Sequence, residues 1–204
     1  MIWNAIQTDA KSSKHLVFAL SQAQTDVLTQ PGPWGSAFDG NCIGLAANWI
    51  GLQYQGLNFP LDGDVCETPP WQASQAQNLS DAAPGTWRNQ WEAAGSVFQL
   101  GISSGLYATR SDSPSADFLW SIMSKAYGCY GVTLVRAGGA HAIALRHGRD
   151  NRYHLFDGNY YHVAMTGIDR FQAFVAKYLD DTGYRKRYTS ATHVTGITPP
   201  IGKA

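Results

Sequence analysis

The 204-residue sequence has few cysteines, no net charge and no long hydrophobic run. Its three cysteines, Cys42, Cys66 and Cys129, are too few and too widely spaced for a disulfide framework, so we expect folding in a reducing compartment. Near the N-terminus the longest apolar run is Leu16 to Leu20, which is too short for a signal-peptide core or a membrane span. We therefore expect no membrane span, and any export would use a machine that needs no cleavable leader.

The sequence also lacks the charge imbalance and the ligand motifs that mark several protein classes. Its 15 Lys and Arg residues balance 15 Asp and Glu residues, so no overall field points to nucleic acid or to an anionic membrane. The basic run at 184–188 is short, and its alternation predicts a half-exposed strand. There is no H-E-x-x-H motif and no paired C-x-x-C motif, so we expect no metal site and no cofactor.

The apolar residues that are present predict helices first and strands afterwards. At 44% hydrophobic residues the chain can bury a core, and we expect one domain over residues 1–204, helical to about residue 128 and sheet-rich over about 129–204. Helices are expected at 12–29, from Cys42 onward, at 87–98, after 113–114 and at 168–179; strands are expected at 130–139, 140–148, 152–163 and 183–194. Residues 62–84 are interpreted as a long surface connection with short helical pieces. This order predicts an α+β fold with a mainly antiparallel sheet and flanking helices.

One cysteine stands where polar loop residues give way to an apolar helix, in the stretch FDGNCIGLAANWIGL (38–52). A sulfur atom at a helix start is close to unpaired backbone N–H groups and to the positive end of the helix dipole, which favours the reactive thiolate. Cys42 is therefore a candidate nucleophile, with a buried thiol that only fills space as the alternative. Cys66 and Cys129 are expected to be unreactive, or else joined in a disulfide.

A thiolate nucleophile needs a proton acceptor, and that imidazole needs an orienting partner. Among the six histidines, His141 stands out in G-G-A-H-A-I-A-L, where glycines precede an apolar strand. Asp157 stands out in L-F-D-G-N-Y-Y, because acids rarely occur inside an aromatic strand. The alternatives are a core histidine for His141 and an ordinary Asp-Gly turn for Asp157, with Asn159 as the fallback orienting residue.

The turn between these two strands decides whether the two side chains can meet. With an odd connection, either 148–150 or 147–151, His141 lies directly opposite Asp157 and Leu145 faces Tyr153. The shared face is then apolar, and we expect it to lie against the cysteine helix. In this arrangement His154 points to the other face and is left out of the site.

Three blocks of sequence, in the same order, resemble the YopT-type cysteine peptidases, which are bacterial effectors and toxins with a papain-like core. They are N-C-I-G-L-A-x-x-W around Cys42, H-A-I-A-L from His141, and Y-H-L-F-D-G-N-Y around Asp157. The resemblance covers about 38–52 and 130–163, and the helices between only by their order. It implies a papain-like fold and a thiol peptidase that cleaves a protein in a target cell.

The resemblance also implies a role for each residue. Cys42 would attack a peptide carbonyl, His141 would pair with the thiolate and protonate the leaving amine, and Asp157 would orient the imidazole. The backbone N–H of Cys42 is one candidate for binding the oxyanion, and the neighbourhood of Asn41 or Asp39 is another. Papain-like enzymes usually carry an amide side chain a few residues before the cysteine; this sequence has serine and alanine there, at 36–37, so the second donor is unassigned.

Two other functions remain open from the sequence. A glutamine deamidase or transglutaminase-like acyltransferase would use the same three residues and differ in the amide attacked and in the final acceptor. A binding module with a dead site would keep Cys42 for packing only. For the peptidase we expect synthesis in the bacterial cytoplasm, export into a target cell, and a neutralising immunity protein or a chaperone as partner.

Overall fold

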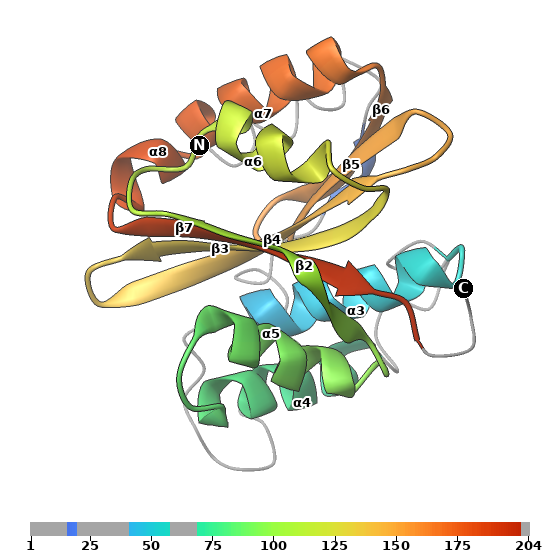
Figure 1. Cartoon of the computed structure of the whole chain (residues 1–204), viewed down its shortest axis with the longest axis vertical. Helices are drawn as coiled ribbons and strands as arrows, with labels where there is room; N and C mark the ends of the chain where they lie inside the picture. Colours follow the sequence, from blue (N-terminus) through green and yellow to red (C-terminus); the bar gives the residue numbers. More distant parts are fainter. Residues whose placement is uncertain (1–15, 20–40, 58–68, 201–204) are drawn as a thin grey trace.

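The computed structural model describes residues 16–19, 41–57 and 69–200, and within them it shows a seven-stranded antiparallel sheet with helices on both faces (Figure 1). The strand order is β1-β6-β5-β4-β3-β7-β2. The strands are β1 (Leu16–Ala19), β2 (Gly101–Arg110), β3 (Gly128–Arg136), β4 (Gly139–His147), β5 (Arg152–Asp157), β6 (Tyr161–Thr166) and β7 (Ala191–Thr198). The helices are α3 (Cys42–Tyr54), α4 (Pro69–Ala82), α5 (Trp87–Ser96), α6 (Ala116–Met123), α7 (Ile168–Asp181) and α8 (Tyr184–Arg187).

Four consecutive strands, β3 to β6, form the centre of the sheet; β3 and β4 match two predicted strands, whereas the single strand expected at 152–163 is two strands, β5 and β6. They are rich in Val, Ile, Leu and Tyr, which suit a pleated surface buried on both sides. The pairing of Arg136 with Gly139 leaves a two-residue turn between β3 and β4, and Gly138 in that turn has a φ of 74°. Such turns need positive φ, which glycine adopts without strain.

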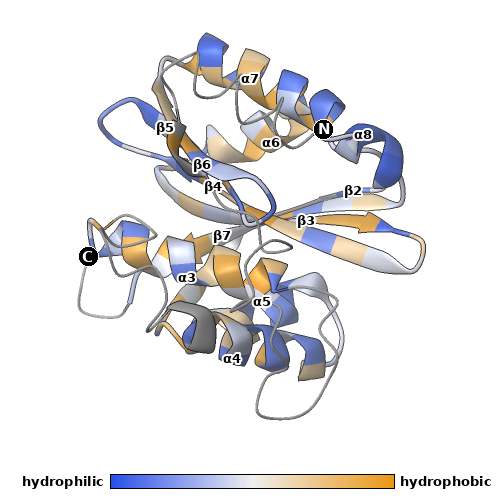
Figure 2. Ribbon diagram, turned by 180° about the vertical axis from the view of Figure 1, so that it is seen from behind, coloured by the Kyte–Doolittle hydropathy of each residue, from blue (hydrophilic) through white to orange (hydrophobic). Residues whose placement is uncertain are grey.

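The sheet separates two hydrophobic cores. On one face Ile143, Leu145 and Leu155 pack with apolar residues of α6 and α7. On the other face Ala144 and Phe156 pack with residues of α3, α4 and α5. Figure 2 shows hydrophobic residues in the strands and in α3, whereas α8 is hydrophilic. The site described below lies at one end of this sheet, where α3 begins.

Several predicted helices are confirmed, although α6 begins at Ala116, two residues after the predicted start at 113–114. The Thr86 hydroxyl accepts a hydrogen bond from Asn89 N at the start of α5, and Ser115 accepts one from Phe118 N at the start of α6. In α5, Trp91 lies over Gly131 of β3, where an added Cβ would come within 2.4 Å of the indole ring, and its Nε1 donates to Thr133. The helix predicted at 168–179 is α7.

Two predicted elements near the N-terminal half of the chain are wrong. Within the helix expected at 12–29, residues Leu16–Ala19 form the edge strand β1, which pairs with β6; the rest of that range lies outside the described residues. The surface connection expected at 62–84 contains the 14-residue helix α4, of which Ala73, Ala76 and Ser80 are buried. Apart from Gln77, its buried residues are small, so it lacks the large apolar side chains by which amphipathic helices are recognised.

Two further differences concern strands. The chain at 101–110, expected within the helical part, forms β2 at the other edge of the sheet, next to β7. The basic run at 184–188 is not a strand: α8 forms one short turn there, after Gly183 with a φ of 70°. The last strand, β7, therefore begins only at Ala191. None of the described helices is long and apolar enough to span a membrane.

Candidate active site

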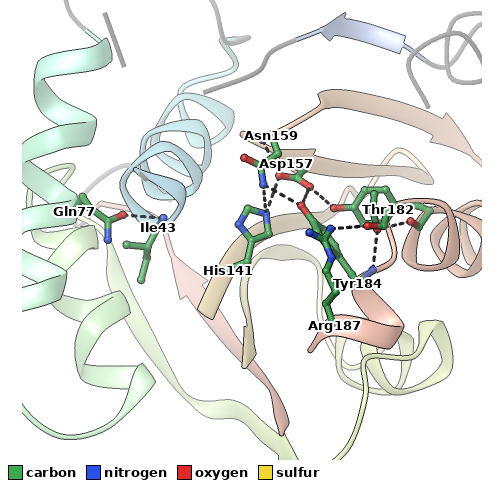
Figure 3. Close-up of polar contacts among 9 residues, drawn as sticks. Ile43, Gln77, His141, Asp157, Asn159, Thr182, Tyr184 and Arg187 are labelled. Carbon is green, nitrogen blue, oxygen red and sulfur yellow. Dashed lines mark hydrogen bonds and ion pairs between the residues drawn. The ribbon is translucent and has the colours of Figure 1, made fainter. Parts of the chain in front are cut away.

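Cys42 is the first residue of α3, as the sequence predicts, and its side chain is partly exposed. The preceding residue, Asn41, makes no side-chain capping hydrogen bond to the helix. The cap comes instead from α4, where Gln77 Oε1 accepts hydrogen bonds from Ile43 N at 3.1 Å and from Gly44 N at 3.2 Å (Figure 3). The start of the cysteine helix is thus fixed by a neighbouring helix.

Gly44 makes this close contact between α3 and α4 feasible. A Cβ atom at position 44 would lie 1.9 Å from the carbonyl oxygen of Ala73, so a larger residue would force the helices apart. Gln77 is itself buried, and its amide nitrogen donates to Asp81 Oδ1 at 2.8 Å. Both polar ends of the Gln77 side chain therefore have partners, which fixes the orientation of its carbonyl group toward α3.

His141 and Asp157 are in direct contact. The His141 Nε2 atom lies 2.9 Å from Asp157 Oδ1, and both side chains are buried. Because Nε2 is directed at Asp157, Nδ1 is the ring nitrogen left for another partner, and Cys42 lies near enough to the imidazole to contribute to its raised pKa. The structure thus brings together the three residues that the sequence singled out.

The register that joins β4 and β5 differs from the predicted one by two residues. Leu145 pairs with Leu155, and His147 pairs with Tyr153, so Asp157 is not directly opposite His141. Gly148 N donates to Arg152 O, so the turn is centred on residue 150 instead of the expected residue 149. A shift of two residues keeps every side chain on its face, so His141 and Asp157 still share one face as diagonal neighbours.

The face that these two residues share does not lie against the cysteine helix, contrary to the sequence-based expectation. Ile143 and Leu155, on that face, belong to the core with α6 and α7, while α3 packs on the opposite face. His141 and Cys42 meet because both lie at the end of their elements, β4 and α3, at the rim of the sheet. The contact is therefore between the ends of elements rather than across a packed face.

The buried pair His141–Asp157 is charged. Burial alone would lower the pKa of His141, but the negative Asp157 carboxylate, the hydrogen bond that His141 donates to it and the neighbouring Cys42 raise that pKa to about 10. Burial likewise tends to raise the pKa of Asp157, but the His141 charge and hydrogen bonds from His141, Tyr178 and Asn159 N hold it below its usual value. At neutral pH the pair is imidazolium and carboxylate, because each stabilises the ionised form of the other.

Asp157 has further partners that the sequence did not reveal. Asn159 N donates to Oδ1 at 2.8 Å, and the hydroxyls of Tyr178 and Tyr184 donate to Oδ2. The first of these bonds is an Asx turn, so Asp157 also fits the turn-residue interpretation that the Asp-Gly pair suggested. The side chain of Asn159, the fallback orienting residue, lies 3.4 Å from His141 Nε2 and donates to Tyr184 (Figure 3).

The candidate oxyanion donors are only partly described. Asn41 is buried at the N-cap position of α3. Asp39 lies outside the described residues. The Cys42 backbone N–H is the first of α3, and the next two N–H groups are taken by Gln77, which lies in a segment that the sequence did not assign to the site. The helical spacing of Ala73, Ala76 and Ser80 around Gln77 was the available signal.

In the part of the chain that the structure describes, the other cysteine and the other histidines are separate from this cluster. Cys129 is a free, buried thiol, and burial raises its pKa to about 12, which favours the predicted lack of reactivity. Cys66 lies outside the described residues. His154 points away from Asp157, as predicted, and contacts His162 at 2.9 Å beneath α3. Among the described residues no group of three His, Cys, Asp or Glu side chains is placed to hold a metal ion.

The chain matches no family model and no curated protein. Among solved structures, the crystal structure of the Pseudomonas avirulence protein AvrPphB aligns with a TM-score of 0.63 and 12% identity, over 91% of this chain and 98% of that chain. The peptidase domain of Streptococcus ComA, a bi-functional ABC transporter involved in a quorum sensing pathway, aligns with a TM-score of 0.35 and 11% identity, over 79% of this chain and 94% of that chain. The likeness to AvrPphB confirms the predicted fold class, an α+β fold with a papain-like core.

Proposed function

We propose that this protein is a papain-like thiol peptidase that uses Cys42 as nucleophile, His141 as general base and acid, and Asp157 as the orienting carboxylate. The observation that carries the proposal is the His141 ring held between the Asp157 carboxylate and the side chain of Cys42 at a helix start. A thiol beside an imidazolium at a helix N-terminus is the arrangement that activates cysteine for acyl transfer. The papain-like fold is consistent with this chemistry.

The reaction would proceed in two stages. The Cys42 thiolate attacks the carbonyl carbon of the scissile amide, and the carbonyl π electrons move to oxygen to form the oxyanion. The intermediate collapses when His141 gives its proton to the amine nitrogen, the C–N bond breaks, and a thioester remains on Cys42. Neutral His141 then removes a proton from water, and the resulting hydroxide attacks the thioester, which releases a carboxylic acid and restores the thiolate.

Asp157 and the start of α3 would support these steps. The buried carboxylate stabilises His141 as imidazolium during the thiolate stage and keeps Nδ1 directed at the sulfur. The backbone N–H of Cys42, together with a donor from the neighbourhood of Asn41, would bind the oxyanion. Because Gln77 accepts the next two N–H groups of α3, it fixes the direction in which the first N–H points.

The substrate would be a protein in a target cell. The three motif blocks around Cys42, His141 and Asp157 resemble the YopT-type peptidases, and the fold resembles a Pseudomonas avirulence protein. These two similarities support a bacterial effector or toxin. We propose that it is made in the bacterial cytoplasm, is exported into a target cell and has an immunity or chaperone protein as partner. We further propose that residues 1–204 act as one catalytic domain, because both helical layers pack on a single sheet.

Mass spectrometry of a target-cell lysate separates this function from its alternatives. Lysate treated with the wild-type protein should contain new N-termini that are missing after treatment with Cys42→Ala or His141→Ala protein. Unit-mass deamidation or cross-linked peptides that depend on Cys42 would instead identify a glutamine deamidase or acyltransferase. Identical lysates for wild type and a folded Cys42→Ala variant would contradict any catalytic role and favour a binding module.

A further inference from the structure

The Asp157 carboxylate is completely buried, and its surroundings contain more donors than a His–Asp pair requires. Oδ1 accepts from His141 Nε2 at 2.9 Å and from Asn159 N at 2.8 Å. Oδ2 accepts from Tyr178 OH at 2.5 Å and from Tyr184 OH at 2.9 Å. A carboxylate offers about four lone-pair sites, so these four donors fill its accepting capacity.

The two hydroxyl donors reach Asp157 from the C-terminal elements rather than from the hairpin. Tyr178 comes from the end of α7, and Tyr184 is the first residue of α8. Between them, Thr182 Oγ1 donates to Tyr178 O and accepts from Tyr184 N, while Gly183 takes a left-handed conformation with a φ of 70°. Gly183 allows the sharp turn, because a left-handed residue after a helix is unstrained only when it lacks a Cβ atom.

Both tyrosines are rigid and remain protonated. Their side chains are almost fully buried, and the two rings contact each other edge-on with centroids 5.7 Å apart. Burial, followed by the Asp157 charge, raises the pKa of both phenols well above the usual value, so each keeps the proton that it donates. The Asn159 side chain donates to Tyr184 OH at 3.1 Å, which directs the phenolic hydrogen toward the carboxylate.

Tyr184 also contacts the imidazole itself. The His141 and Tyr184 ring centroids are 5.0 Å apart at an interplanar angle of 52°, within the range in which a cation is attracted to an aromatic face. The Arg187 guanidinium covers the Tyr184 ring at 5.1 Å. The other titratable groups that bear on the His141–Asp157 pair or on the two tyrosines are Cys42, Tyr160, Tyr161 and Tyr188.

We infer that Tyr178 and Tyr184 are positioning residues that hold Asp157 as an anion, with Oδ1 directed at His141, through their hydrogen bonds to Oδ2. Rotation of the carboxylate would break two of these bonds, and protonation of Oδ2 would place a hydrogen against a donor hydroxyl. The inference rests on the proposed function for its catalytic meaning, because an orienting carboxylate matters only if His141 serves Cys42. The geometry of the carboxylate itself does not depend on that function.

The test is a titration of the Asp157 carboxyl carbon by NMR in the full chain with 13C-labelled aspartate, assigned with an Asp157→Asn variant. In the wild type the chemical shift of this carbon should remain that of an ionised carboxylate at pH values below the usual titration range of aspartate. Tyr178→Phe and Tyr184→Phe should each raise the midpoint by about one pH unit, since each removes a hydrogen bond to the charged form. Tyr188→Phe is the matched control, because its ring lies 6.3 Å from the His141 ring without a hydrogen bond to Asp157, and it should leave the midpoint unchanged.

A second measurement at neutral pH covers the case in which acid unfolds the protein first. The His141 Nε2 proton, buried against Asp157, should exchange slowly with water in the wild type and several-fold faster in either tyrosine variant. If one variant fails to fold, the other carries the same test. Unchanged Asp157 titration and unchanged proton exchange in a folded variant would overturn the inference. Failure of the proposed function is a different result, in which these NMR effects occur but Cys42→Ala leaves lysate cleavage unaltered.

Discussion

Gln77 offers a sharp test of how the reactive cysteine is positioned, because its role was not visible in the sequence. Its Oε1 atom accepts from Ile43 N and Gly44 N, and the side chain is buried. Gln77→Leu keeps the approximate volume but leaves two N–H groups at the start of α3 without an acceptor. Loss of a capping acceptor costs about 0.5–2 kcal/mol, and a buried unsatisfied donor about 1–3 kcal/mol.

We therefore expect Gln77→Leu to lower the free energy of unfolding by about 2 kcal/mol, which corresponds to about 4–8 °C in Tm for a chain of this size. The assay is urea or thermal unfolding followed by circular dichroism. Gln75→Leu is the matched control, because Gln75 lies on the same helix and is exposed, and surface changes usually stay within about 0.5 kcal/mol. Alkylation of Cys42 should also slow in Gln77→Leu, because the helix start is no longer held in place.

A second substitution separates the effect on stability from the effect on charge. Gln77→Glu keeps an acceptor at the start of α3, but it adds a negative charge near Cys42 and beside Asp81, whose side chain now accepts from the Gln77 amide. This charge should disfavour the Cys42 thiolate and slow its alkylation by about tenfold. If Gln77→Leu unfolds at the same urea concentration as Gln75→Leu, the capping role of Gln77 is wrong.

Three further predictions concern the His141–Asp157 pair and the contact between Gly131 and Trp91. In Asp157→Asn, burial is no longer opposed by the carboxylate, so the pKa of His141 should fall below its ordinary value; turnover should drop, though less than in His141→Ala. The pKa of His141 in the folded protein is raised from 6.5 to about 10, so the protonated ring stabilises the fold fully below about pH 6.5, and this stabilisation is lost as the pH rises toward about 10. The urea midpoint of the wild type should therefore fall over that pH interval, whereas the midpoint of His141→Gln should not. Gly131→Ala should lower the free energy of unfolding by about 1–3 kcal/mol in urea titrations, because the added carbon overlaps the Trp91 ring, and a wild-type midpoint would show that the ring can move away.

The two residues of the hairpin could be predicted because strands have a period of two. Apolar residues alternate on both sides of the turn, which places His141 and Asp157 on the same face with any odd connection. The same periodicity explains the error in register, since a shift by two residues leaves each side chain on the same face of the sheet. What fixes the register is the turn itself, where Asn151 has a φ of 58° and Gly148 N bonds Arg152 O. A hydrophobic pattern contains no information on that choice.

The helix that supports Cys42 could not be recognised in the same way. α4 is rich in Gln, Ser and Ala, and its buried residues include Ala73, Ala76 and Gln77 rather than large apolar side chains. Small residues are needed there because α4 packs directly on Gly44. A helix that packs by close backbone approach leaves little hydrophobic signal, so its composition resembled that of a loop.

The donors around Asp157 show a different limit of sequence reasoning. Tyr178 and Tyr184 follow Asp157 by 21 and 27 residues. Tyr178 reaches it from near the end of α7, and Tyr184 only after the chain has turned at Gly183. No local spacing links them to the carboxylate. The basic residues that follow Tyr184 also suggested a strand, although the left-handed Gly183 starts a helical turn instead. Contacts made by chain reversal depend on tertiary structure, and the sequence alone did not reveal them.

The most direct test of the central claim is the rate at which iodoacetamide modifies each cysteine at about pH 6, measured by peptide mapping. Ordinary thiols are almost fully protonated at this pH and react slowly, whereas a thiolate paired with an imidazolium reacts quickly. Cys129 is buried and serves as the internal control. We predict that Cys42 in the wild type is modified about tenfold or more faster than in folded His141→Ala protein, while Cys129 stays unmodified. Equal rates for Cys42 in both proteins, or equal labelling of Cys42 and Cys129, would contradict the account.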